Sequence, residues 1–188
     1  MPSRSGWLKA PWRRTERRSH DPYWDFFINT PPADRANSVL DVIRKAPEGN
    51  VFPTRADLHT PEVTASHVKE MGRYLGADLV GITRLDDDAG HPFAIVCAVG
   101  AGDDPREALG IGGQVPVQNG LFVTFVLSAW IRELGYRAST ATSLDGARLA
   151  VAAKLGTLDR SGKLVTAEYG TRVHVADVIR TDLPLTAA

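Results

Sequence analysis

The residue types that most often carry chemistry are sparse in this sequence, and their spacing excludes several common sites. Cys97 is the only cysteine, so these 188 residues can form neither an internal disulfide nor a zinc or iron–sulfur site made of several cysteines. No two of the five histidines are four residues apart, the spacing typical of helical zinc sites. The sequence also holds no Gly-Lys-Ser/Thr phosphate loop and no nucleophile-elbow pentapeptide. We therefore expect no metal site and no hydrolase of these classes.

Two segments rich in glycine could instead bind a large ligand. Residues 100–120 include Gln118 and Asn119, whose amides can hydrogen-bond a ligand but do not release protons near neutral pH. Residues 155–170 can bring the backbone close to a bulky ligand, because glycine has no side chain to interfere. The alternative is that Gly162 and Gly170 only supply turn conformations in a surface loop.

The elements that would position these segments follow from the spacing of apolar residues. Thr60 as an N-cap predicts a helix that ends at Gly76. Residues 93–99 are apolar throughout, which predicts a central strand buried on both faces. Helices and strands interleave without regular βαβ spacing, so we expect an α+β or mixed α/β fold with a central sheet. The other expected elements are a strand at 79–85, a long loop at 100–120, a buried helix at 121–134, a helix at 145–155 and a strand at 171–180.

The charge balance argues against a nucleic-acid partner. Lysine and arginine together number 22, and so do aspartate and glutamate, whereas nucleic-acid binders usually carry a basic excess. No stretch reaches the run of about 18 apolar residues that a membrane-spanning helix needs, and the first residues lack the apolar core of a secretory signal. We therefore expect a cytoplasmic protein that interacts with neither nucleic acid nor a membrane.

The first 32 residues differ in composition from the remainder. Residues 1–20 hold six basic residues against one acidic residue, and three of the four tryptophans precede residue 25. Aromatic side chains this dense rarely stay exposed, so we expect residues 1–32 to form an arm that packs on the main domain or on a second subunit. Residues 33–188 then form one domain, and we expect a homodimer.

Four motifs, taken in order, give the sequence a family resemblance. They are LGADLVGI at 75–82, IRELGYRA at 131–138, LGTLDRSGKLVTAEYGTRV at 155–173 and TDLPL at 181–185. Their order and spacing resemble the cobalamin-binding core shared by reductive dehalogenases and epoxyqueuosine reductases. The resemblance covers residues 61–185.

This resemblance implies a nitroreductase-like α+β fold, with a central mixed sheet flanked by helices. It also implies a cobalamin whose corrin ring lies on one face of the sheet and whose nucleotide tail is bound by the protein with its base detached from cobalt. We expect the ligand to lie between the two glycine-rich segments. The expected cofactor-binding residues are Gly156, Arg160, Gly162, Lys163, Leu164, Tyr169, Gly170, Arg172, Gln118 and Asn119.

The sequence departs from the family pattern in two ways. Near the start of the buried helix the dehalogenases carry a tyrosine and the epoxyqueuosine reductases an aspartate, but residues 115–120 read VPVQNG. The family enzymes also continue past TDLPL into cysteine runs that hold two iron–sulfur clusters, whereas Cys97 is the only thiol here. The catalytic residues are therefore unassigned, and electrons for cobalt are expected from a separate iron–sulfur or flavin reductase.

Three functional hypotheses follow. The first is a corrinoid-binding protein that acts as a carrier or as one component of a two-protein reductase. The second is an FMN-binding oxidoreductase, because nitroreductases of the same fold class bind FMN. The third is an interaction module without a ligand, built around the aromatic arm. Whether the chain is an enzyme stays open at this point.

Overall fold

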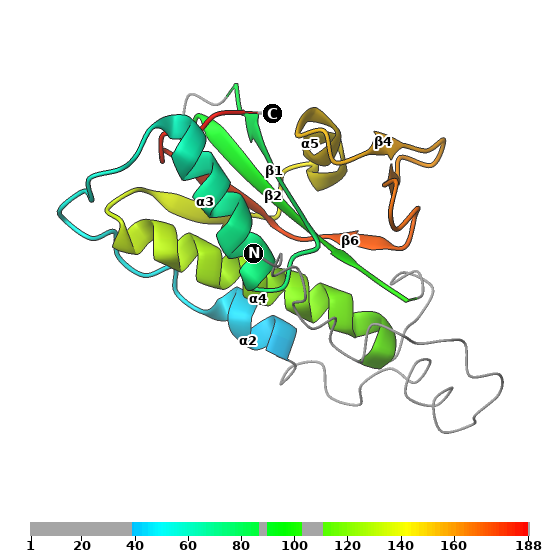
Figure 1. The fold of residues 1–188 in the computed structure, drawn as a ribbon. Coiled ribbons are helices and arrows are strands. Elements are labelled where there is room, and N and C mark those ends of the chain that lie inside the picture. The colour runs from blue at the N-terminus through cyan, green and yellow to red at the C-terminus, as the bar shows by residue number, and fades with distance from the viewer. Residues whose placement is uncertain (1–38, 87–89, 103–110, 188) are drawn as a thin grey trace, which may run out of the picture.

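The computed structural model describes residues 39–86, 90–102 and 111–187 (Figure 1). The arm expected at residues 1–32 lies outside the described residues. Among those described, no helix is long and apolar enough to span a membrane. The elements are α2 (Val39–Lys45), α3 (Pro61–Tyr74), β1 (Leu79–Arg84), β2 (Phe93–Gly100), α4 (Ile111–Glu133), β3 (Ala138–Ala141), α5 (Gly146–Ala152), β4 (Thr157–Leu158), β5 (Leu164–Val165), β6 (Val173–Val175) and β7 (Val178–Thr181).

The main sheet has the strand order β1-β2-β7-β3, and β6 also pairs with β2. The α+β prediction is confirmed, but the expected mixed sheet is wrong, because every pair among the described strands is antiparallel. The reason lies in the connections. The crossover through α4 makes β2 and β3 run in the same direction, but β7 comes from the C-terminal part of the chain and inserts between them, antiparallel to both.

Two apolar layers cover the two faces of the sheet. On one face, Phe93, Ile95 and Cys97 of β2 pack with α3 and α4. On the other face, Val96 and Ala98 pack with α5 and with the small β4–β5 hairpin, which lies on the opposite side from α4 in Figure 1. Every residue of β2 from 93 to 99 is buried, so the prediction of a central strand buried on both faces is confirmed.

A β-bulge separates β6 from β7. On β2, Ala98 pairs with Val175 of β6, and Ile95 pairs with Ile179 of β7. The two β2 residues are three positions apart, but their partners are four positions apart. The extra residue falls at 176–177, where the Ala176 amide donates to the Cys97 carbonyl at 2.9 Å. The alternation of side chains between the two faces of the sheet breaks there, and both Ala176 and Asp177 face α4. The single strand predicted at 171–180 is therefore two strands.

Helix α3 is confirmed and helix α4 is longer than predicted. The Thr60 side chain caps α3 by accepting from the Val63 amide. Helix α4 begins at Ile111, so the loop predicted to extend to residue 120 was wrong from residue 111 onward. Glycine and proline in this stretch indicated a loop, but packing against the sheet outweighs their low helix propensity. A Cβ at Gly120 would lie 3.0 Å from Ala176 Cβ, so glycine lets α4 approach the sheet closely.

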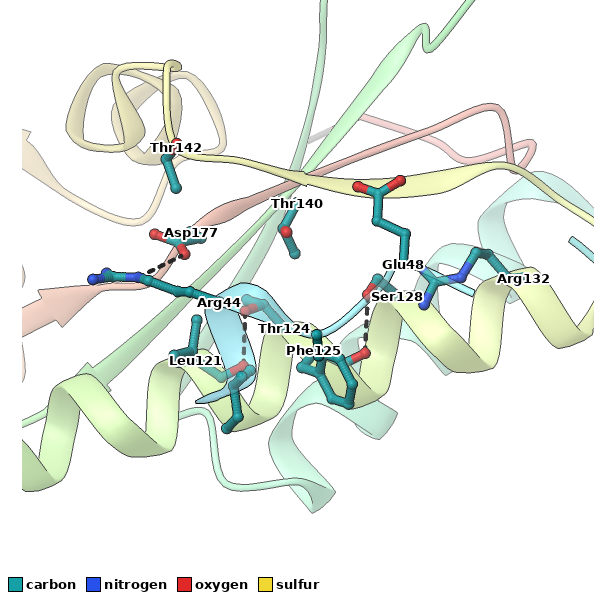
Figure 2. Close-up of a pocket in the computed structure, with 12 residues that line it drawn as sticks. Arg44, Glu48, Leu121, Thr124, Phe125, Ser128, Arg132, Thr140, Thr142 and Asp177 are labelled. Carbon is teal, nitrogen blue, oxygen red and sulfur yellow. Dashed lines mark hydrogen bonds and ion pairs between the residues drawn. The ribbon is translucent and has the colours of Figure 1, made fainter. Parts of the chain in front are cut away.

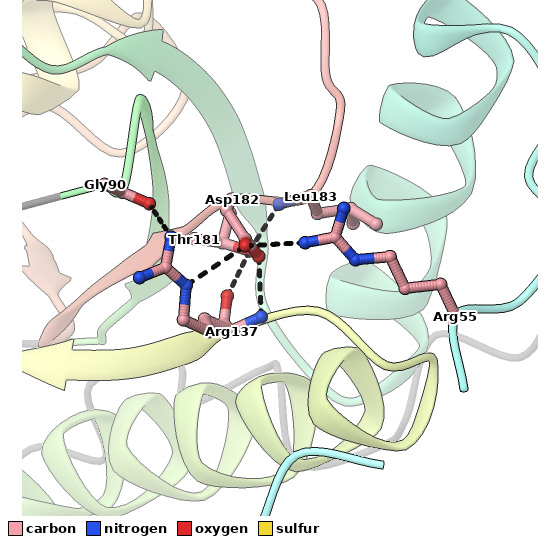
Figure 3. Close-up of polar contacts among 6 residues, drawn as sticks. All are labelled: Arg55, Gly90, Arg137, Thr181, Asp182 and Leu183. Carbon is pink, nitrogen blue, oxygen red and sulfur yellow. Dashed lines mark hydrogen bonds and ion pairs between the residues drawn. The ribbon is translucent and has the colours of Figure 1, made fainter. Parts of the chain in front are cut away.

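The TDLPL motif ties the end of the sheet to two other segments (Figure 3). The Asp182 carboxylate accepts from the Arg137 amide at 2.6 Å, from Arg137 Nε at 3.1 Å and from Arg55 Nη2 at 3.2 Å. Arg137 Nη2 also donates to the Gly90 carbonyl at 2.7 Å, and Thr181 Oγ1 donates to the Arg137 carbonyl at 2.7 Å. The motif therefore has a structural role here, because these contacts join residues from four parts of the chain.

Replacing Asp182 with asparagine is expected to lower the free energy of unfolding by about 1–2 kcal/mol, because the amide keeps the shape but loses the charge that both arginines contact. Solvent limits the effect, since the Arg55 and Arg137 side chains are 63% and 53% exposed. Urea unfolding would measure it. The control is Asp57→Asn at an exposed aspartate, with a change within about 0.5 kcal/mol. An unchanged midpoint for Asp182→Asn would contradict this role.

Candidate functional site

The tip of the β4–β5 hairpin is a turn organised by one carboxylate. Asp159 Oδ1 accepts from the Ser161 amide at 2.8 Å, from the Ser161 hydroxyl at 2.7 Å and from the Lys163 amide at 2.9 Å. The hydrogen bond from the Lys163 amide, followed by that from the Ser161 hydroxyl, lowers the pKa of Asp159. The turn therefore holds Arg160 and Lys163 beside a fixed negative charge.

Glycines leave open space along this segment. Gly162 and Gly170 have φ angles of +77° and +59°, and no atom lies within 4 Å of the position that a Cβ would take at either residue. Gly156 differs, because a Cβ there would lie 2.2 Å from the Val165 carbonyl oxygen. Gly156 thus allows the two hairpin strands to approach, whereas Gly162 and Gly170 expose backbone to whatever occupies the adjacent space.

A groove of about 340 Å³ lies between the hairpin tip and β6. The hairpin contributes Ser161, Gly162, Lys163 and Leu164. The other walls are Val173, His174 and Val175 of β6 and Ala147 of α5. Three of the ten predicted cofactor-binding residues, Gly162, Lys163 and Leu164, therefore line one cavity.

Tyr169 fixes the junction between the two glycine-rich segments. A Cβ at Gly100 would lie 2.3 Å from the Tyr169 ring, so glycine is required where the ring covers the end of β2. Burial and the neighbouring Asp78 carboxylate raise the pKa of Tyr169 to about 12. A phenol with this pKa is a poor proton donor at neutral pH. Beside it, Arg172 Nη1 donates to the Gly102 carbonyl at 3.0 Å.

The remaining predicted residues lie elsewhere. Gln118 and Asn119 belong to α4, which covers the face of the sheet opposite to the hairpin. Arg160 is exposed at the hairpin tip. The structure thus places eight of the ten predicted residues in or beside the hairpin and separates the two amides from them.

His174 lies on β6, the strand that forms one wall of the groove, but its ring points to the opposite face of the sheet. Its ring lies beside Gly120 of α4, since a Cβ at Gly120 would be 3.2 Å from His174 Cδ2. Burial lowers the pKa of His174, and this effect outweighs the neighbouring Asp177 carboxylate, which acts to raise it. The alternating pattern at 171–180 predicted a strand but gave no signal that this strand would form a wall of the groove.

The groove fits part of a cobamide better than all of it. Its volume is at the lower end of the range of about 300–1,000 Å³ typical for small-molecule sites. A corrin ring with its side chains exceeds that volume, whereas a nucleotide tail is narrow. Lys163 supplies a positive charge for a phosphodiester, and Val173, Val175 and Ala147 supply apolar walls for a flat base. The residues present therefore fit the tail.

A second and larger recess, of about 420 Å³, lies on the α4 side of the sheet (Figure 2). It contains none of the ten predicted cofactor-binding residues. In the described part of the chain, no group of three or more histidine, cysteine or acidic side chains is placed to hold a metal ion.

Comparison with known proteins identifies relatives by structure and not by sequence. No family model matches the sequence. No curated protein matches it either. The chain superposes on the catabolic reductive dehalogenase NpRdhA in complex with 3-bromo-4-hydroxybenzoic acid with a TM-score of 0.68 and 27% identity, over 80% of this chain and 24% of that one.

Two further structures agree. A reductive dehalogenase whose structure suggests a mechanism for B12-dependent dehalogenation matches with a TM-score of 0.63 and 27% identity, over 85% of this chain and 27% of that chain. Epoxyqueuosine reductase from Streptococcus thermophilus shares the fold, with a TM-score of 0.51 and 15% identity over 65% of this chain and 47% of that chain. The predicted resemblance is confirmed, and the chain spans about a quarter of the length of the dehalogenases.

Proposed function

We propose that this chain binds a cobamide, with the nucleotide tail in the β4–β5 groove, and that it acts as a corrinoid carrier or as one component of a two-protein reductase. The observation that carries the proposal is that five of the eight residues lining the groove come from the LGTLDRSGKLVTAEYGTRV segment, on a fold similar to that of a B12-dependent dehalogenase. Among the described residues we find no motif or structural match that favours FMN over a cobamide.

Each groove residue has a defined part in this proposal. Lys163 neutralises the phosphodiester of the tail. Arg160, exposed at the hairpin tip, adds a second positive charge nearby. Asp159 keeps the turn in its binding conformation, because three hydrogen bonds fix the loop before the ligand arrives. Gly162 leaves room for the tail, and Tyr169 closes the end of the segment against Gly100.

The cobamide would supply a cobalt that changes oxidation state. Cys97 is the only thiol in the sequence and is fully buried, so the residues of this chain form no electron path to cobalt through cysteine-bound clusters. We propose that a separate iron–sulfur or flavin reductase supplies electrons. Tyr169, with its raised pKa, does not act as a proton donor in this proposal, and neither amide of Gln118 and Asn119 releases a proton.

Titration of the full chain with hydroxocobalamin is expected to shift the visible absorbance bands, because holding the tail in the groove detaches its base from cobalt. Cobinamide, which lacks the nucleotide tail, is expected to bind at least about tenfold more weakly. FMN, titrated in parallel, should leave the flavin spectrum unchanged. Binding of FMN alone, or of neither cofactor, would overturn the proposal in favour of a flavoprotein or an interaction module.

Filling the groove provides the matched test. Gly162→Phe is expected to weaken hydroxocobalamin binding by about tenfold or more, because the new ring occupies the open space beside the backbone. Gly76→Phe is the control: Gly76 also has a positive φ and open space around it, and it lies outside the groove. Equal affinities for the two variants would place the ligand elsewhere.

We also propose that the chain forms a homodimer. Val115 and Phe122, one heptad apart on α4, are 38% and 49% exposed, and a second copy would cover this apolar face. Light scattering on the full chain should give twice the monomer mass, and Phe122→Glu should restore the monomer. A monomeric wild-type chain would contradict the proposal.

A further inference from the structure

The recess on the α4 side is bounded by charged groups at its two ends. At one end Arg44 Nε lies 3.9 Å from Asp177 Oδ2, which the β-bulge turns toward α4. At the other end are Arg132 of α4 and Glu48. The lining residues of α4 extend from Leu121 to Arg132, about 16 Å along the helix axis at 1.5 Å per residue. The recess is therefore elongated.

Arg132 is a buried cation that forms no ion pair within 4 Å with any described carboxylate. The residue is 7% exposed, and in the described part of the chain its side chain makes one hydrogen bond, from Nη1 to the Ala138 carbonyl at 2.9 Å. Burial lowers the pKa of Arg132, and Glu48 acts on it only through longer-range attraction. Figure 2 shows the guanidinium extending toward Ser128 and Glu48 inside the recess. A buried guanidinium that makes a single hydrogen bond leaves other N–H donors without acceptors, so this end favours a ligand group with two acceptor oxygens, such as a carboxylate.

The middle of the recess accepts hydrogen bonds. Thr124 Oγ1 donates to the carbonyls of Gly120 and Leu121 at 3.2 and 3.1 Å, and Ser128 Oγ donates to the Phe125 carbonyl at 2.9 Å. With their protons committed to the helix, both hydroxyls offer only lone pairs to an occupant. A ligand here needs a hydroxyl or amino donor.

The walls restrict the ligand further. Leu121, Phe125 and Ile43 supply an apolar surface for a hydrocarbon or aromatic body. Glu48 and Asp177 disfavour a dianion such as a phosphate monoester, which usually requires more than one cation. A single carboxylate, by contrast, matches the two-pronged donor geometry of one guanidinium.

We propose that this recess binds a small organic monocarboxylate that has an apolar or aromatic body and a hydroxyl or amino group at its far end. The carboxylate pairs with Arg132, the body lies along Phe125 and Leu121, and the far donor meets the Thr124 hydroxyl or the Asp177 carboxylate. The site is separate from the β4–β5 groove and does not rest on cobamide binding.

Isothermal titration and ligand-observed NMR with the full chain test this site. The probe is 3-(4-hydroxyphenyl)propanoate, compared with its uncharged amide and with phenyl phosphate. We expect the acid to bind with a dissociation constant of about 1 mM or tighter, and each comparator to bind at least about tenfold more weakly. No binding of the acid, or equal binding of the amide, would overturn the proposal.

Variants locate the carboxylate. Arg132→Lys is expected to weaken binding of the acid about tenfold or more, because an ammonium cannot make the paired hydrogen bonds. Thr124→Val removes, with a side chain of similar shape, the hydroxyl that the far donor meets, and it should weaken binding about threefold, so the test does not depend on the buried arginine variant folding. Arg148→Lys, at an exposed arginine outside the recess, is the control. Affinities unchanged in the folded Thr124→Val and Arg132→Lys variants would refute the site.

Discussion

The substitution Gly135→Ala is expected to lower the free energy of unfolding by at least about 3 kcal/mol. Gly135 ends α4 with a φ of +83°, and the amides of Gly135 and Tyr136 bond back to the carbonyls of Arg132 and Ile131. An alanine Cβ would meet two penalties there. The positive φ strains any L-residue, and the Cβ would lie 2.5 Å from the Thr54 carbonyl oxygen.

The clash cannot relax easily, because the segment over Gly135 is held by backbone hydrogen bonds. The Phe52 amide donates to the Arg132 carbonyl at 2.9 Å, and the Ala56 amide donates to the Leu134 carbonyl at 3.0 Å. Urea unfolding monitored by circular dichroism would measure the change. Gly76→Ala is the control: its φ is +117° but its surroundings are open, so it should lose only about 1–2 kcal/mol. Equal losses for the two variants would exclude the contact with Thr54 as a cause.

Alkylation of Cys97 in the folded chain at pH 8 is expected to be at least about 1,000-fold slower than in the chain unfolded in urea. Burial raises the pKa of the Cys97 thiol from 9.0 to about 12. Below pH 9 the fraction of the thiol present as the reactive thiolate is therefore about 1,000-fold smaller in the folded chain than in the unfolded chain. The residue is also fully buried in β2 between Val96 and Ala98, which adds a steric barrier.

Iodoacetamide labelling followed by mass spectrometry would give both rates on the wild-type chain. Gly162→Cys in a Cys97→Ala background provides an exposed thiol on the same fold, and it should react at nearly the unfolded rate. A folded Cys97 that reacts within tenfold of the unfolded chain would contradict the burial of β2. Slow labelling that rises with urea would report the opening of the sheet.

The elements that the sequence predicted are those fixed by local signals. The Thr60 cap and the apolar spacing after it predicted α3, and the uninterrupted apolar run at 93–99 predicted β2. The start of α4 was missed because its stability comes from contacts with β6, which lies more than 50 residues away in sequence. The antiparallel pairing of β7 between β2 and β3 is likewise a long-range property that no local pattern encodes.

The same distinction applies to the sites. The hairpin residues were found because they lie within one continuous motif, so their proximity in space follows from proximity in sequence. Strand β6 becomes a wall of the groove, and Asp177 joins the second recess, through the pairing of β6 and β7 with the sheet. Glu48 and Arg132 are also brought together by tertiary packing, and neither has a sequence signal that points to the other.

The β-bulge at 176–177 also bears on how the chain avoids aggregation. Strand β3 pairs with β7 but not with β6, so among the described strands β6 leaves one edge without a partner. A regular edge of this kind is a template for strands of other molecules. The extra residue interrupts its hydrogen-bond spacing and increases its twist. Deletion of one bulge residue would join β6 and β7 into one regular strand with an unpaired β6 edge, and such a variant should form amyloid-like fibres more readily than the wild-type chain.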